Sequence, residues 1–110
     1  MFISREDFEK IDIRTGIIIE VNDFPKARKP SYQLTIDFGE LGIKRSSAQI
    51  THHYEKEELV SKQIIAVVNF PPKQIANFIS EVLVTGFPNE DGHVVLCAID
   101  KPVPNGSKLF

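Results

Sequence analysis

The strictest alternation of apolar and polar positions in the chain runs from Tyr32 to Phe38. Every second residue in that stretch is apolar, while Gln33, Thr35 and Asp37 stand between them. Side chains of a strand point to opposite faces in turn, so the pattern predicts a strand with one face against a core and the other in water.

Other apolar runs predict further strands. They are Ile17–Val21, Ile43–Arg45, Ile64–Val68, Val82–Val84 and Val94–Ile99. The run at 64–68 is apolar on both faces and therefore predicts a central strand. Gly39–Gly42 has the composition of a hairpin turn, and Gly86–Gly92 predicts a longer, turn-rich connection.

Two helices are expected. Ser46 and Gln49 have capping-box spacing, which predicts a helix after the third strand with Ile50 and Tyr54 on one face. Residues 55 to 59 either extend this helix or form a second turn. A shorter N-terminal helix is predicted to start at Ser4, with Asp7 completing the capping box and Phe8 packing inward.

Together these elements predict an all-β fold. About five strands, closely spaced turns and one short helix between strands 3 and 4, with small terminal elements, describe a five-stranded OB-fold barrel. The pattern alone leaves an SH3-like barrel or a small α+β sandwich open. The 110 residues are enough for one core but not for a second lobe, so 1–110 is predicted to be a single domain.

Composition narrows the class of protein. The apolar fraction of 42% and the charged fraction of 25% are those of an ordinary globular chain. No apolar run approaches membrane-spanning length, and acids follow the first residues where a signal peptide would be apolar, so we expect a cytoplasmic protein without membrane insertion. Cys97 is the only cysteine and lies in an apolar run, which favours a small core residue.

The net charge of −2 argues against binding nucleic acid through overall charge, but the cations are unevenly distributed. Seven of them lie in or beside predicted loops: Arg14, Lys26, Arg28, Lys29, Lys44, Arg45 and Lys73. Pro25 and Pro30 bracket three of the seven and restrict that loop. If the loops meet, they form a basic patch suited to phosphate contacts. The chain has no Trp, which favours recognition of shape and phosphate over base stacking.

No catalytic or metal-binding arrangement emerges. His52 and His53 are neighbours, so on the predicted helix their side chains point about 100° apart and cannot hold one metal ion. Ser46 and Ser47 lack the setting of a nucleophile elbow, and the glycines form no phosphate loop. We therefore expect a protein that is not an enzyme and that uses no cofactor and no metal.

The segment from Asn69 to Glu81 allows two interpretations. Its Pro-rich start and its apolar residues fit a short helix or loop that caps one end of the barrel. They also fit a partly exposed apolar lip that binds a partner. In the second case the candidate peptide-binding residues are Phe70, Ile75, Phe78 and Ile79.

Motifs along nearly the whole chain resemble the CsaA family, the stand-alone form of a tRNA-binding domain that some aminoacyl-tRNA synthetases carry. The longest are 8–16, 46–51, 63–73, 80–84 and 102–106. The resemblance implies an OB-fold homodimer with chaperone-like activity linked to protein export, within a wider family that binds tRNA by shape at its outer corner. It also implies RNA-binding roles for Asn69, Lys73 and Ser80, and it places Arg14 and Arg28 at positions that are basic in the family, in the opening strand and its loop.

Four positions depart from that pattern. Gln74 replaces a second basic residue, Asn77 a Gly, Ile79 a Lys and Val82 a Met. Each change makes the segment less basic, stiffer or more apolar. The primary hypothesis is therefore an ATP-independent chaperone for unfolded polypeptides or preproteins, and the alternative is a tRNA-binding protein that uses the basic residues. Apolar residues near both ends, such as Phe2 and Phe110, predict a symmetric homodimer built from the termini.

Overall fold

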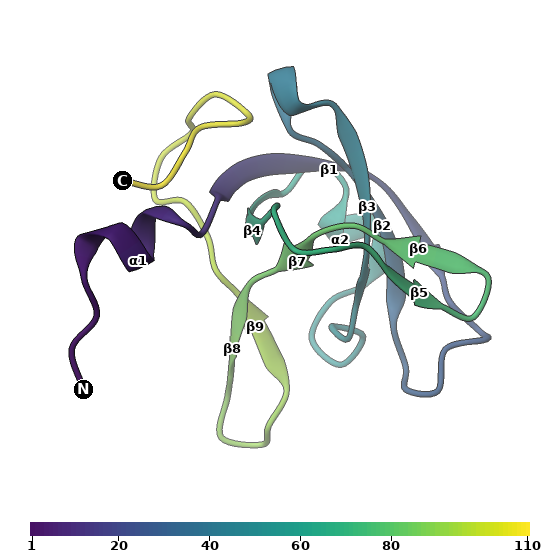
Figure 1. Ribbon diagram of the computed structural model, residues 1–110. Helices are drawn as coiled ribbons and strands as arrows, with labels where there is room; N and C mark the ends of the chain where they lie inside the picture. The colour runs from purple at the N-terminus through teal and green to yellow at the C-terminus, as the bar shows by residue number, and fades with distance from the viewer.

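The computed structural model describes residues 1–110, which form a small, nearly closed antiparallel barrel (Figure 1). Its five-stranded sheet has the order β3-β2-β1-β4-β7. The strands are β1 (Ile13–Asp23), β2 (Tyr32–Asp37), β3 (Ile43–Ala48), β4 (Gln63–Val67) and β7 (Leu83–Val84). The predicted OB-type barrel is confirmed.

The long strand β1 makes the barrel possible because it serves two neighbours. Its first half pairs with β4 and its second half with β2, and the register shifts between Ile18 and Glu20. A bulge of this kind bends the strand and increases its twist. At Gly16, an added Cβ would lie 2.7 Å from Ile36 Cγ2, so only glycine lets the bent strand approach β2 this closely.

The barrel is closed where the residues just before β7 contact the edge of β3. The Ser46 hydroxyl donates to the carbonyl of Val82 at 3.0 Å, and the Glu81 amide donates to the carbonyl of Arg45 at 2.8 Å. These bonds satisfy polar groups that the sheet edge would otherwise leave unpaired.

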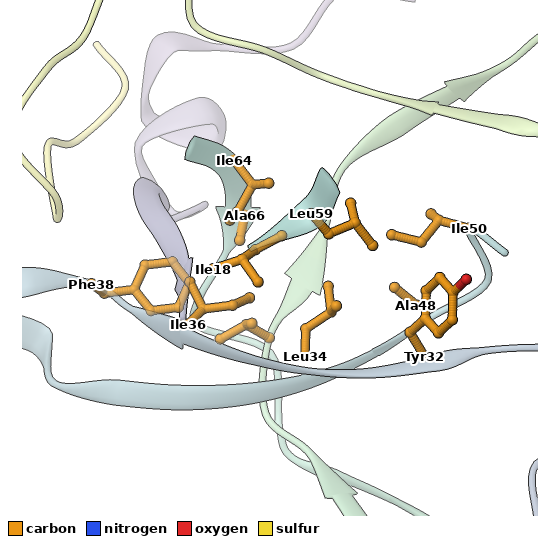
Figure 2. Close-up of a cluster of buried hydrophobic side chains, with 11 residues drawn as sticks. Ile18, Tyr32, Leu34, Ile36, Phe38, Ala48, Ile50, Leu59, Ile64 and Ala66 are labelled. Atoms are coloured by element: carbon orange, nitrogen blue, oxygen red, sulfur yellow. The ribbon is translucent and has the colours of Figure 1, made fainter. Parts of the chain in front are cut away.

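The core lies inside this barrel (Figure 2). The alternation predicted along β2 is confirmed, because Tyr32, Leu34 and Ile36 are buried while the residues between them are half-exposed. Ile18 from β1 and Ile64 from β4 meet them from the neighbouring strands. Apolar burial of this cluster is the main stabilising term of a domain this small.

The helix predicted from Ser46 is wrong. Residues 46 to 48 are the end of β3, where Ser46 pairs with Leu34 and bonds Val82 through its hydroxyl. The helix that does form is α2 (Lys56–Leu59), capped reciprocally by Glu55 and Glu58. The β2–β3 pairing continues through Ser46 and Ser47, so Ser46 is in a strand and does not cap a helix.

The shorter elements fit the expectations more closely. Ser4 and Asp7 form the predicted capping box of α1 (Arg5–Glu9), although Phe8 is only half-buried. The turn between β2 and β3 contains η1 (Gly39–Leu41). No helix is long and apolar enough to cross a membrane.

Two hairpins extend from the barrel. One pairs β5 (Lys73–Ile75) with β6 (Phe78–Ser80), so the segment after Asn69 contains no helix. The other pairs β8 (Gly86–Pro88) with β9 (Val94–Leu96). The last strand, predicted over Val94–Ile99, is therefore shorter than expected and belongs to this hairpin, not to the barrel sheet. The start of the predicted turn region Gly86–Gly92 is strand β8. Cys97 lies just after β9 and is half-buried.

Candidate ligand-binding surfaces

Two segments distant in sequence meet at the end of the barrel opposite the termini: the loop from 24 to 31 and the β5–β6 hairpin (Figure 1). Between them lies an open groove of about 600 Å³, here called the basic groove. Four cations line it: Lys26, Arg28, Lys29 and Lys73. Its remaining lining is neutral, with Ser31, Ser47 and Gln49 among the polar side chains, and no carboxylate takes part.

The loop is held in place by its first residue. Phe24 is buried and packs against Phe78 of the hairpin, with ring centroids 5.3 Å apart. The Ala27 amide donates back to the carbonyl of Phe24 at 3.2 Å, and the Ser31 hydroxyl donates to the carbonyl of Lys29 at 2.9 Å. The cations are thus carried on a folded turn that is anchored to the hairpin opposite it.

The hairpin is in turn fixed to β3. The guanidinium of Arg45 lies over the Phe78 ring, 4.3 Å from its centroid, an attractive cation–π arrangement. The Ser80 hydroxyl accepts a hydrogen bond from the Ser47 amide at 3.0 Å. Arg45 and Ser80, both predicted to bind RNA, therefore hold the hairpin against the barrel.

A second groove opens on the other side of Lys73 and is here called the apolar groove. Phe70, Pro71, Val82 and Leu83 supply its apolar lining, and Lys73, Ser80 and Glu81 its polar lining. Its volume is about 440 Å³. Phe70 and Leu83 keep 54% and 51% of their surface exposed, so the groove presents two large apolar side chains to solvent at one place.

The four predicted peptide-binding residues do not form one lip. Phe70 lines the apolar groove, whereas the half-buried Ile75 lines the basic groove. Ile79 is exposed but lies between two inward-facing residues of β6, so it points away from the barrel. Phe78 is only 2% exposed and is inaccessible to a ligand in this structure.

The residue that sequence reasoning missed is Leu83. Its neighbour Val82 is buried, and alternation along the strand places Leu83 on the outer face. The apolar run at 82–84 held that signal, but it became informative only once Val82 was known to face the core.

Five predicted RNA-binding residues lie outside the basic groove: Arg45 and Ser80, which hold the hairpin, and Arg14, Asn69 and Lys44. Arg14 bonds Asp12 at 2.6 Å and the carbonyl of Gly106 at 3.0 Å, joining the start of β1 to the C-terminal segment. The Asn69 amide accepts from the Asp12 amide and donates to the carbonyl of Lys10. Lys44 is half-buried on β3. Arg14 and Asn69 are therefore already engaged in contacts within the chain.

Comparisons with known proteins agree with this architecture. The family described as "Putative tRNA binding domain" matches residues 13–108. A crystal structure of the chaperone CsaA from Bacillus anthracis is 50% identical, covers 100% of both chains and superposes with a TM-score of 0.94. The CsaA chaperone from Picrophilus torridus is 60% identical over 99% of this chain and 100% of its own, with a TM-score of 0.92.

Among curated proteins, the methionine–tRNA ligase of Methanocaldococcus jannaschii is 33% identical over 101 residues. That match covers 92% of this chain but only 15% of the ligase. The chain thus corresponds to a small part of such enzymes, their tRNA-binding part. The matches confirm the resemblance to the CsaA family that the sequence motifs indicated.

Proposed function

Because the chain belongs to the tRNA-binding domain family and matches CsaA chaperones over its whole length, we propose that it is a chaperone that binds unfolded polypeptide without ATP. The observation that carries this proposal is the apolar groove. Two large side chains, Phe70 and Leu83, are half-exposed on either side of it although the barrel has a complete core of its own. Exposed apolar surface of this kind is typical of an interaction site.

The chemistry of the groove suits an extended chain of mixed sequence. Phe70 and Leu83 offer apolar surface to side chains that a folded protein would bury. Lys73 and Glu81 put one charge of each sign at the same groove. Because neither sign of charge is favoured, the groove selects polypeptides by their apolar content more than by their charge. Unfolded preproteins are clients of this description.

A reduced and alkylated protein that cannot refold tests the proposal. It should bind at micromolar concentration without nucleotide. Raising the salt concentration from about 0.05 to 0.5 M should leave its affinity nearly unchanged, because apolar contacts are not screened. Binding that needs ATP, or that disappears at the higher salt concentration, would contradict the proposal.

The basic groove favours a second candidate function, the binding of tRNA. Four cations from two separate segments line one groove that contains no carboxylate, in a protein whose net charge is −2. Such a local concentration of positive charge attracts phosphate even when the whole molecule is acidic. The surfaces adjoin at Lys73, so RNA and polypeptide would compete.

Salt dependence distinguishes this second function. If about four phosphates are neutralised, the logarithm of the association constant for tRNA should fall with the logarithm of the salt concentration with a slope of about −3 to −4. Changing Arg28, Lys29 and Lys73 together to Ala should flatten the slope. The matched control changes Lys10, Lys62 and Lys101, which lie outside the basic groove and outside the pocket at the termini, and should leave the slope unaltered.

We further propose that the protein is a homodimer that works in the cytoplasm on polypeptides destined for export. Support for the dimer comes from the terminal end of the barrel. A shallow pocket between α1 and the C-terminal residues is lined by Phe8, Ile11, Leu109 and Phe110, and Ile3 beside it is exposed. A twin subunit would cover this apolar surface.

A further inference from the structure

The three histidines of the chain gather at one place, between the loop at 51–54 and the tip of the β8–β9 hairpin. The His52 and His93 rings stack with their centroids 3.9 Å apart and their planes 6° from parallel. His53 meets His93 edge-on at 5.6 Å. The rings stack on one another and are not arranged to hold a metal ion.

Asn89 fixes the hydrogen-bonding role of His53. The Asn89 side-chain oxygen accepts from the amides of Asp91 and His93, at 3.0 and 2.9 Å, so its orientation is determined by the turn. Its Nδ2, which can only donate, therefore faces His53 Nε2 at 2.6 Å. His53 must present a lone pair at Nε2, which a doubly protonated imidazole does not have.

No carboxylate compensates for a proton in this cluster. Glu90 and Asp91 on the hairpin turn are exposed, and Glu55 on the loop side caps α2. None of them brings an oxygen within 4.0 Å of an imidazole nitrogen. On the same side, the Lys62 ammonium lies 5.8 Å from the ring centroid of Tyr54, the residue after His53.

The cluster holds an element with few other attachments. The β8–β9 hairpin pairs only with itself, and at its base Thr85 bonds the carbonyl of Ile65. Farther along, the Leu96 amide donates to the Tyr54 hydroxyl at 3.0 Å, and Val94 and Leu96 pack on the core. If the tip is released, the hairpin is free to move about its base.

We propose that His52, His53, His93 and Asn89 form a proton-sensitive latch that holds the β8–β9 hairpin closed at neutral pH and releases it in mildly acidic solution. Protonation of His53 puts two donors face to face at Asn89, and protonation of both His52 and His93 puts two positive rings in a stack. Proton binding thus favours the open form, in which Val94 and Leu96 are uncovered. The latch goes beyond the proposed function and does not depend on it.

Hydrogen exchange followed by NMR tests this latch in the full chain. Between about pH 7.5 and 5.5, the range in which imidazoles ordinarily titrate, protection of the Leu96 amide should fall at least tenfold after correction for intrinsic exchange. Amides of β2 should keep their protection. In the double variant His52→Phe/His53→Gln, a phenyl ring replaces one imidazole of the stack and an amide oxygen can accept from Asn89. Neither new group takes a proton, and a proton on His93 then faces no second positive ring, so Leu96 should stay protected.

Three results would overturn the proposal. One is a Leu96 amide whose protection does not change with pH in the wild type. Another is an equal loss of protection in the double variant. The third is a parallel loss in β2, which would mean that the whole barrel unfolds and not that a hairpin opens.

Discussion

Phe70 and Phe78 are eight positions apart in one Pro-rich segment, yet one is half-exposed and the other is among the most buried side chains. Phe78→Ala should lower the free energy of unfolding by about 3–5 kcal/mol, because it leaves a cavity beside Phe24 and removes the ring under Arg45. Phe70→Ala should cost below about 1 kcal/mol. Urea denaturation of both variants checks this pair, and equal losses would contradict the assignment.

The sequence could predict the apolar character of these residues but not their environments. Alternation along β2 correctly predicted which side chains are buried, since a strand has only two faces. The segment after Asn69 has no such period, and the direction of each side chain depends on Phe24 and Arg45, which come from distant parts of the chain. For the same reason the sequence did not show that Arg14 and Asn69 are engaged by neighbours of their own.

Tyr32 gives the fold a dependence on alkaline pH. Burial raises the pKa of its phenol above the ordinary 10.0, and the carboxylates of Glu55 and Asp23 add to the shift. The folded state holds the phenol proton more tightly than the unfolded state does. The protonated phenol therefore contributes its full stabilisation below pH 10.0, and this stabilisation is lost as the pH rises through the pKa of the folded state. The wild type should therefore lose stability above that pH.

Tyr32→Phe isolates the effect. At neutral pH it should lower the free energy of unfolding by about 0.5–1.5 kcal/mol, because the Tyr54 carbonyl loses its donor at 2.8 Å. Above pH 10.0 its stability should fall less steeply than that of the wild type. Denaturation at a series of pH values measures both, and parallel alkaline losses would show that other groups are responsible.

At the level of elements, the β5–β6 hairpin contains a strained turn. Ala76 has a φ of +53°, a conformation that costs residues with a Cβ about 1–2 kcal/mol. Ala76→Gly should remove that strain, lose part of the gain to backbone entropy and stabilise the protein by about 0.5–1 kcal/mol. Ala98→Gly, at an exposed position without positive φ, is the matched control and should not stabilise. Thermal melts compare the two, and a destabilised Ala76→Gly would contradict the argument.

Most elements could be predicted from the sequence, and the errors have physical causes. The strands of the barrel and the capping box of α1 follow from local pattern. The helix expected at Ser46 fails because pairing of β3 with β2 continues through that residue. The β8–β9 hairpin was misjudged because a three-residue strand beside a turn has too short a pattern to recognise. Convergence of the basic loop with Lys73 is a tertiary contact that no local pattern contains.

At the scale of the whole molecule, the terminal end predicts the assembly. Sedimentation at micromolar concentration should give the mass of a dimer, because Leu109 and Phe110 line an apolar pocket that a single barrel leaves open. Changing both residues to Ser should shift the mass to that of a monomer without unfolding the barrel, since neither residue belongs to the core. A monomeric wild type would remove the dimer and every model that needs two grooves on one particle.

The central claim is that unfolded polypeptide binds in the apolar groove, and the direct measurement is the affinity for a permanently unfolded, fluorescently labelled protein. Phe70→Ser/Leu83→Ser should weaken binding at least about tenfold, because these two side chains supply most of the exposed apolar lining. The matched control Ile79→Ser/Phe87→Ser removes two apolar side chains that are also exposed but lie outside the groove, and it should bind as the wild type does. Equal affinities for all three proteins, or a loss confined to the control, would contradict the account.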